Sequence, residues 1–328
     1  HGSHLFHMHG CRNFTIERVT ADYSFSIVHM VSTHGENIGG VINNLTGTRM
    51  ACMVDFGGGG QDVVVSNVVG DGEGNFRSNE EAFDIGGAKN VKIINSILKN
   101  FRTGVLIKGE EGKPWDNISI ENCYFEGFTH RGIDANPGDV RPFDLNTGTL
   151  ILSNVQFMSD KLDAEENTMG INIRETFGKF HFNDVLVNVN GNGVFVRGFT
   201  NLKFKNMDIE SNGYGMFFES VALSPNGDLE LEGITINTNQ VQGCNSAKIT
   251  NFKITNNSGY SIFLRNFSHL FMTNGVIKDT YGSAIRLHYG KDRLMNADSL
   301  NGLNTHISNI DIIDWGIGSQ YAVGLDFI

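Results

Sequence analysis

Carboxyl groups suited to acid–base chemistry gather in the first half of the chain. Glu80, Glu81 and Asp84 lie close together, and Asp55 and Asp134 stand on either side of them. Glycosidic hydrolysis needs two carboxyl groups, about 5–5.5 Å apart for retention and about 6.5–9.5 Å apart for inversion. Crowded carboxylates also raise one another's pKa, as a general acid requires. Glu81, Asp84 and Asp134 are therefore the predicted catalytic residues; the alternative is that they are solvated surface carboxylates.

Basic and polar residues near these carboxylates form a second candidate set, which would bind the substrate. Arginine and lysine recognise carboxylate and sulfate groups, such as those of an acidic polysaccharide. The alternative is that these cations only offset their acidic neighbours. The predicted substrate-binding residues are Asp55, Lys108, His130, Arg131, Arg174 and Arg197.

The candidate residues are spread over more than 140 positions, from 55 to 197, so a fold must bring them together. The sequence contains a repeat that can do so. Short alternating runs flank a recurrent Asn, as in NVKIINSIL at 90–98 and NISIENCYF at 117–125. Such alternation is typical of half-buried strands, and a repeat of roughly 20–50 residues indicates a solenoid, propeller or array. Aligning the runs predicts twelve coils, with Asn in nine and Arg18, Asp184 and Gly233 in the others. The aligned positions are 18, 44, 67, 95, 122, 154, 184, 206, 233, 251, 274 and 309.

A third run in each repeat reads small residue, apolar, X, apolar, Z, as in AFDIG at 82–86 and GIDAN at 132–136. Three short strands per coil predict an all-β, right-handed parallel β-helix, whereas a propeller blade would need four strands. We expect residues 1–328 to form one such domain. Both ends of the chain fall inside a coil, so we expect it to be a fragment of a longer protein.

The third strand is the face that we expect to carry chemistry, because X and Z point outward there. Stacking turns these positions into two columns. The predicted X column is Val28, Met53, Asp84, Leu106, Asp134, Asn172, Phe195, Phe217, Asn245, Phe263, Arg286 and Gly324. The predicted Z column is Met30, Asp55, Gly86, Lys108, Asn136, Arg174, Arg197, Glu219, Ser246, Arg265, His288 and Asp326.

The column positions predict the distances between the candidate catalytic carboxylates. Asp84 and Asp134 are expected two coils apart, about 9.6 Å at the usual strand spacing, and Asp55 closer to Asp84 on the adjacent column. Long insertions at 70–79, 109–117, 136–148 and 158–167 border this strip, which predicts a groove for a linear polymer. The outward Phe195, Phe217 and Phe263 indicate a subunit contact or a face covered by a loop, with sugar stacking as the alternative.

The composition of the chain limits the classes of molecule that it is expected to bind. The net charge of −11 argues against nucleic acid, and no apolar stretch is long enough to span a membrane. The four cysteines show no metal-ligand spacing, and Cys52 and Cys244 fall at inward positions. His1, His4, His7 and His9 are interpreted as surface histidines or a tag remnant, so no metal site is predicted.

The coil pattern resembles the pectin-lyase-like superfamily of parallel β-helices along nearly the whole chain. NEEAFDI at 79–85 resembles a motif of the polygalacturonase-like glycoside hydrolases, which implies a catalytic role for Glu81. GINIR at 170–174 resembles a substrate-binding element of that group, which implies such a role for Arg174. The sequence departs from the group at Arg102 and Thr103, where the family has two Asp, and at His130, which is shifted by one. Phage tailspike and tail-fibre depolymerases share this superfamily fold, often as trimers, and resemble the chain best.

These observations predict an enzyme that hydrolyses a bacterial surface or extracellular polysaccharide in a groove on the third-strand face. A homotrimer, located outside the cell or on a phage virion, and no cofactor are expected. Two alternatives remain open. One is a lyase acting on a uronate polymer, with Lys108 or Arg174 in the reaction and a divalent cation held by the acidic residues. The other is a non-catalytic receptor-binding or structural rod.

Overall fold

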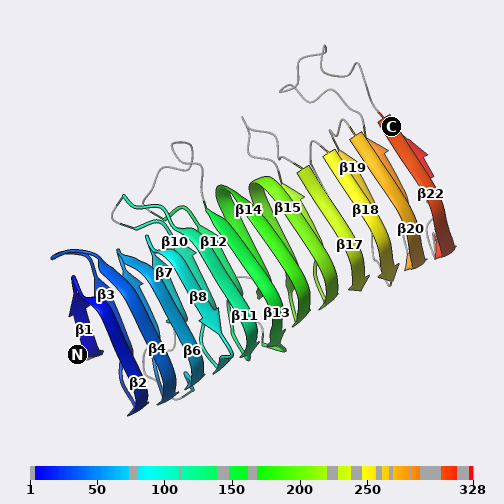
Figure 1. Ribbon diagram of the computed structural model, residues 1–328. Helices are drawn as coiled ribbons and strands as arrows, with labels where there is room; N and C mark the ends of the chain where they lie inside the picture. The colour runs from blue at the N-terminus through cyan, green and yellow to red at the C-terminus, as the bar shows by residue number, and fades with distance from the viewer. Residues whose placement is uncertain are drawn as a thin grey trace.

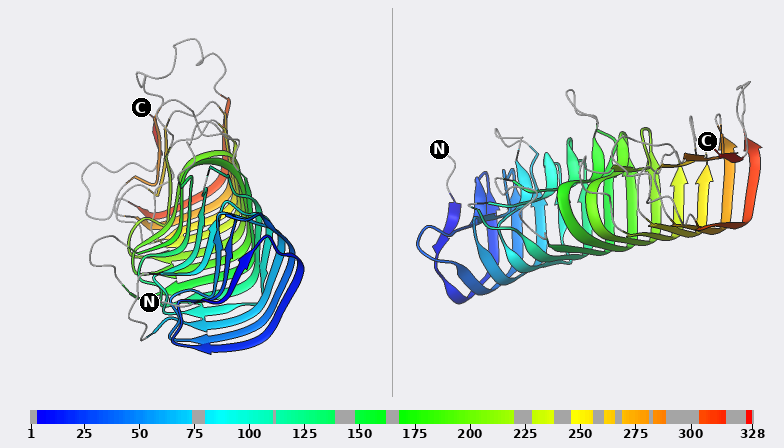
Figure 2. Two further views of the ribbon diagram at one scale, coloured as in Figure 1. Left: turned by 90° about the vertical axis from the view of Figure 1, so that its left-hand side faces the viewer. Right: turned by 90° about the horizontal axis from the view of Figure 1, so that it is seen from above.

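The chain forms an elongated stack of β-coils (Figures 1 and 2). The computed structural model describes residues 4–73, 80–110, 112–138, 148–161, 168–219, 228–237, 246–255, 261–265, 269–280, 283–288, 304–315 and 325–327. Within these ranges every regular element is a β-strand, and the strands pair with their neighbours in parallel. No helix that is long and apolar enough to cross a membrane occurs among these residues.

The strands that carry or flank the Asn positions stack on one another along the rod. In chain order they are β2 (Arg12–Asp22), β4 (Asn37–Thr48), β6 (Gly60–Asp71), β8 (Lys89–Ile94), β9 (Ile97–Lys99), β11 (Asp116–Glu126), β13 (Thr149–Ser159), β14 (Met169–Val189), β15 (Asn192–Ser211), β17 (Asp228–Asn237), β18 (Ser246–Thr255), β20 (His269–Thr280) and β22 (Asn304–Trp315). Each pairs with the corresponding strand of the next coil.

The short strands form the predicted third-strand sheet. They are β1 (His4–His9), β3 (Ser26–Val31), β5 (Val54–Gly57), β7 (Glu81–Gly86), β10 (Thr103–Lys108), β12 (Arg131–Asn136), β16 (Met216–Glu219), β19 (Ile262–Arg265), β21 (Ile285–His288) and β23 (Leu325–Phe327). Between β12 and β16 the sheet is continued by the first halves of β14 and β15, which turn from this side into the Asn-bearing side. Parallel pairing through long connections, rather than hairpins, makes this a parallel β-helix, as predicted.

Stacked apolar side chains fill the interior. Two columns on the third-strand sheet are fully buried, one running from Val54 through Phe83 and Val105, the other from Phe56 through Ile85 and Ile107. Burial of each such side chain contributes about 1.5–3 kcal/mol, so a one-residue slip of a strand would be costly. The alternation therefore fixes which residues lie between the two buried columns and face outward.

The Asn positions are corners of the coil. All twelve aligned positions, including Arg18, Asp184 and Gly233, have a positive φ between 51° and 64°. Asn tolerates this left-handed conformation better than other side chains, and its amide also bonds to the next coil. Asn154 Nδ2 donates to Asn122 Oδ1 at 2.9 Å, and Asn122 Nδ2 donates to Asn95 Oδ1 at 3.3 Å. These bonds join the Asn side chains of successive coils into a ladder, and the positive φ of the corner accounts for the Asn at each step.

The predicted columns are wrong at their N-terminal end, by one residue in β3 and by two residues in β5. Val28, Met30 and Met53 are fully buried rather than outward, and the outward residue of β3 is His29. His29 pairs with Asp55, and Asp55 pairs with Asp84. Asp55 therefore shares the column of Asp84 instead of lying on the adjacent one. From Asp84 to Phe217 the predicted X column agrees with the strand register.

Candidate active site

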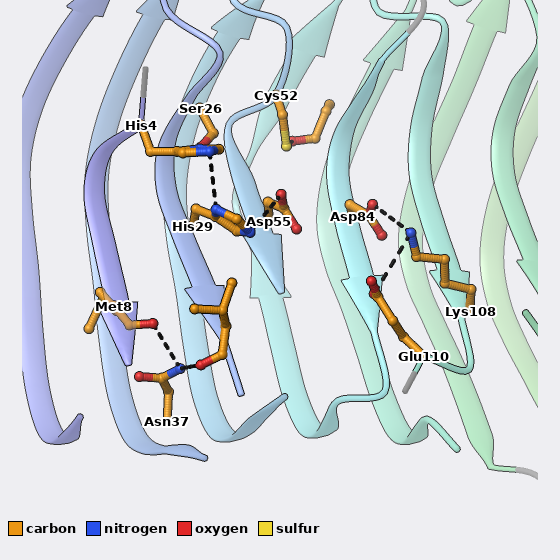
Figure 3. A network of polar contacts seen from close by, with 12 residues as sticks. His4, Met8, Ser26, His29, Asn37, Cys52, Asp55, Asp84, Lys108 and Glu110 are labelled. Atoms are coloured by element: carbon orange, nitrogen blue, oxygen red, sulfur yellow. Dashed lines mark hydrogen bonds and ion pairs between the residues drawn. The ribbon is translucent and has the colours of Figure 1, made fainter. Parts of the chain in front are cut away.

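A row of ionisable side chains crosses the outward face of β3, β5, β7 and β10 (Figure 3). His29, Asp55 and Asp84 occupy equivalent register positions on successive strands, and Lys108 reaches back from β10 to the same place. Two contacts join neighbouring members of this row. Asp55 Oδ2 lies 3.4 Å from His29 Nε2, and Asp84 Oδ2 lies 3.0 Å from Lys108 Nζ. We call His29, Asp55, Glu81, Asp84, Lys108 and Glu110 the acidic cluster.

The carboxyl groups of the acidic cluster are largely withdrawn from water. The side chains of Asp55 and Asp84 keep only 16% and 17% of their exposure. Lys108 donates to Asp84 Oδ2, while Asp84 Oδ1 is buried and has no hydrogen-bond partner within the described part of the chain. A buried acceptor without a donor is costly, which marks Asp84 as a candidate for a ligand's hydroxyl group.

Burial and mutual repulsion raise the pKa values of these acids. Desolvation, followed by repulsion from Asp84, raises the pKa of Asp55 to about 8 and that of Glu81 to about 7. Burial also raises the pKa of Asp84, although attraction by Lys108 opposes the shift. At neutral pH this arrangement places a protonated carboxyl group beside one that a cation helps to ionise.

Glycines make room for the cluster. A Cβ atom on Gly86 would lie 1.7 Å from Glu110 Oε2, so the Glu110 side chain crosses the space that a larger residue would fill. Glu110 Oε2 is 3.8 Å from Lys108 Nζ, which makes it a second acidic neighbour of that cation. Sequence reasoning missed Glu110 as a site residue; the Gly-Gly pair at 86–87 on the outward face was the available signal.

Asp134 lies farther along the same column, separated from Asp84 by Leu106. Asn172 Nδ2 donates to Asp134 Oδ1 at 2.8 Å, and Arg174 Nη2 lies 3.2 Å from Asp134 Oδ2. Asp134 is thus a buried, fully paired carboxylate, whereas Arg174 is 48% exposed. The predicted three-residue catalytic set is therefore divided into the pair Glu81 and Asp84 and a separate Asp134 group.

The other predicted binding residues have different surroundings. His130 and Arg131 are buried, and Arg131 Nη1 donates to the His130 carbonyl oxygen at 3.2 Å. Arg197 is half-buried and pairs in register with Arg174. Cys52 is buried beneath the acidic cluster, as predicted, while Cys244 lies outside the described residues. In the described ranges no group of three or more His, Cys, Asp or Glu side chains is arranged to hold a metal ion.

Only some of the predicted outward aromatic residues and bordering insertions lie among the described residues. Phe195 and Phe217 stack on the outward face with ring centroids 5.5 Å apart and nearly parallel planes. The side chain of Phe263, like those of Glu219, Arg265, His288 and Asp326, is outside the described part. So are most of the insertions at 70–79, 136–148 and 158–167 that were expected to border a groove.

Residues 169–317 match the sequence model of the right-handed β-helix region. The chain is a right-handed parallel β-helix. No curated protein sequence matches the chain.

Solved structures with similar coils include a tailspike protein of Acinetobacter baumannii bacteriophage Fri1, a capsular polysaccharide depolymerase. It has 10% identity and a TM-score of 0.48, over 90% of this chain and 56% of that one. The catalytic unit of an α-1,3-glucanase from Streptomyces thermodiastaticus has 12% identity and a TM-score of 0.47, over 89% and 54%. A surface adhesin of Streptococcus pneumoniae has 12% identity and a TM-score of 0.39, over 90% and 72%. The chain thus spans little more than half the length of the first two proteins.

Proposed function

We propose that the chain hydrolyses glycosidic bonds of a polysaccharide on the outward face of the third-strand sheet. The observation that carries this proposal is the pairing of Asp55 with Asp84 on adjacent strands, both largely withdrawn from water and both with a raised pKa. Paired carboxyl groups with separated protonation states are the usual apparatus of glycoside hydrolysis.

The two carboxyl groups take different roles in this proposal. Asp55 is protonated at neutral pH and donates its proton to the glycosidic oxygen of the leaving group. Asp84 is the carboxylate that acts on the anomeric side, and the charge and hydrogen bond of Lys108 favour its ionised form. Their strands are adjacent, about 4.8 Å apart, which is close to the separation in retaining enzymes. Glu81, the acid suggested by the motif resemblance, lies beside Asp84 and is a second proton donor.

Asp134 acts in substrate binding in this proposal rather than in the reaction itself. Its carboxylate already accepts from Asn172 and Arg174, and it is two strands, about 9.6 Å, from Asp84. An inverting mechanism would instead use Asp84 and Asp134 across that distance. The configuration of the first product distinguishes the two pairs.

Hydrolysis is favoured over the lyase alternative by the state of Lys108. Burial alone would lower the pKa of Lys108, but its attraction and hydrogen bond to Asp84, together with the charges of Glu110 and Glu81, raise it overall. A lysine that stays charged is a poor base for abstracting a proton from a uronate. In this site Lys108 serves as a counter-charge.

Assembly and location follow as further parts of the proposal. Phe195 and Phe217 present a stacked apolar pair on the outward face, which suits a contact between subunits of a homotrimer. A substrate on a bacterial surface would place the protein outside the cell or on a virion. Light scattering of the purified chain tests the trimer.

The test of function is a screen of purified polysaccharides, both neutral α-glucans and acidic polymers such as polygalacturonate and bacterial capsules. Release of reducing ends by the wild type, abolished in Asp84→Asn, supports hydrolysis at this site. Release of unsaturated ends, seen as new ultraviolet absorbance, supports the lyase alternative. Binding to a polymer without any cleavage supports the non-catalytic rod.

A further inference from the structure

His29 links the acidic cluster to a stack of histidines on the first coils. Its ring centroid lies 4.1 Å from that of His4 and 4.8 Å from that of His7, nearly parallel to the latter. His29 Nδ1 is 3.1 Å from His4 Nε2, and its other nitrogen, Nε2, is 3.4 Å from Asp55 Oδ2. Both ring nitrogens of His29 therefore have a defined neighbour (Figure 3).

The backbone leaves space for this imidazole. A Cβ atom on Gly57, the residue beside Asp55 on the outward face, would lie 2.9 Å from His29 Nε2. Glycine at position 57 thus lets the ring tip approach the Asp55 carboxyl group. The His4 ring is in turn held by a contact with a buried residue, because its Nδ1 lies 2.7 Å from Ser26 Oγ.

The three contacts admit one consistent set of neutral tautomers that begins with a protonated Asp55. The Asp55 hydroxyl donates to His29 Nε2, His29 Nδ1–H donates to His4 Nε2, and His4 Nδ1–H donates to Ser26 Oγ. We propose that His29 is a positioning residue for Asp55: its Nε2 accepts a hydrogen bond from the protonated carboxyl group, and His4 and Ser26 fix the tautomer in which it can do so.

The surrounding charges agree with this direction of the bond. Burial, then the charges of neighbouring histidines, lower the pKa of His29 to about 4, so its ring is neutral where Asp55 is protonated. The groups that face the pair come from three sides. They are His4, His7 and His9 on β1, Glu81 and Asp84 on β7, Lys108 at the end of β10 and Glu110 just beyond it.

A role in catalysis for His29 rests on the proposed function, in which Asp55 is the general acid. The hydrogen bond would aim the carboxyl group across the outward face and favour its protonated form. Loss of the acceptor should then move the alkaline limit of activity to lower pH. The tautomer itself is a property of the free protein and can be measured without any substrate.

The decisive test is nitrogen NMR of ¹⁵N-histidine-labelled protein between pH 5 and 7, with the His29 signals assigned by their loss in His29→Gln. We expect Nδ1 to carry the proton and Nε2 to show the shift of an unprotonated acceptor. A proton on Nε2 throughout this range would overturn the proposal, because His29 would then donate to an ionised Asp55. That result would leave hydrolysis by the cluster intact, so the two proposals fail separately.

Activity on a cleaved polymer provides the second readout. In His29→Phe, which removes the acceptor, the alkaline limit should fall by about one pH unit, the worth of one hydrogen bond. His29→Gln keeps an acceptor oxygen and should stay close to the wild type, and His34→Gln, on the exposed edge of the stack, should match it. Gly57→Ala, which crowds the ring, should resemble His29→Phe. Equal pH profiles for all four variants would overturn the positioning role.

Discussion

Asp55 and Asp84 are register partners on adjacent parallel strands, with their carboxyl groups on the same outward column of the rod. Parallel stacking places like residues one above another at about 4.8 Å, where two carboxylates repel strongly. His29 on one side and Lys108 on the other make this pairing tolerable. The two partners differ, because His29 is a neutral ring and Lys108 is a cation, and only the cation favours the ionised form of its carboxyl partner.

The first prediction concerns Asp84. Asp84→Asn removes the charge while keeping the shape, and we expect activity to fall about 10²–10⁴-fold, as for other positioned acid–base groups. Reducing-end assays measure the loss. Asp208→Asn, an exposed carboxylate on β15, is the matched control and should keep full activity. Comparable activity of the two variants would contradict the site.

The second prediction separates Asp134 from the reacting pair. Asp134→Asn weakens the contact with Arg174, so we expect KM to rise and kcat to fall less than about tenfold. Steady-state kinetics on the cleaved polymer measure both constants. A loss of kcat as large as that of Asp84→Asn would favour an inverting pair of Asp84 and Asp134 instead.

The third prediction concerns stability and pH. The folded-state pKa of Asp55 is raised to about 8, so the folded protein binds a proton that the unfolded chain releases near pH 4. The contribution of Asp55 to stability is therefore fully present below about pH 4 and is lost as the pH rises through about 8. Asp55→Asn, which stays neutral, should gain stability over the wild type as the pH rises, on the order of 5 kcal/mol at pH 8.

Urea denaturation at pH 5 and pH 8 checks this sign. The advantage of Asp55→Asn should be larger at pH 8. An equal effect at both pH values would mean that the Asp55 carboxyl group is not held protonated by the fold.

The fourth prediction concerns the Asn corners. Asn122→Ala must keep a φ of 53° without a favourable side chain and loses its bonds to Asn95 and Asn154, which should cost about 2–4 kcal/mol. Asn122→Gly keeps the backbone freedom and should cost about half as much, since Gly233 serves the same corner. Chemical denaturation of both variants measures the difference. An equal loss of unfolding free energy in the two variants would mean that Asn122 stabilises the fold through its hydrogen bonds alone and not through its backbone conformation.

The sequence was sufficient to predict the coil and its corners. The corner residues are recognisable because few side chains other than Asn suit a positive φ and can also bond to the next coil. The outward column was predicted correctly from Asp84 to Phe217, where apolar and polar residues alternate cleanly. At the C-terminal end the prediction is wrong, because Arg286 pairs with Asp326 and not with Gly324. In β3 the run SIVHMV is apolar at both alternations except for Ser26 and His29, so the register was assigned one residue off.

Because of this register error, His29 was not identified as a neighbour of Asp55. With Val28 and Met30 taken as outward, His29 had no place on the active face, although it is the one ionisable residue of its run. Glu110 was missed for a different reason. It lies beyond the strand, and its approach depends on the absence of a side chain at Gly86, a three-dimensional fact that strand periodicity does not contain.

The most direct test of the central claim is digestion of a cleaved polysaccharide in ¹⁸O-labelled water, followed by mass spectrometry of the products. Hydrolysis by Asp55 and Asp84 predicts one heavy oxygen per broken bond, at the new reducing end, with the wild type and not with Asp84→Asn. Products that carry an unsaturated end and no heavy oxygen, or labelled products formed equally by Asp84→Asn, would contradict it.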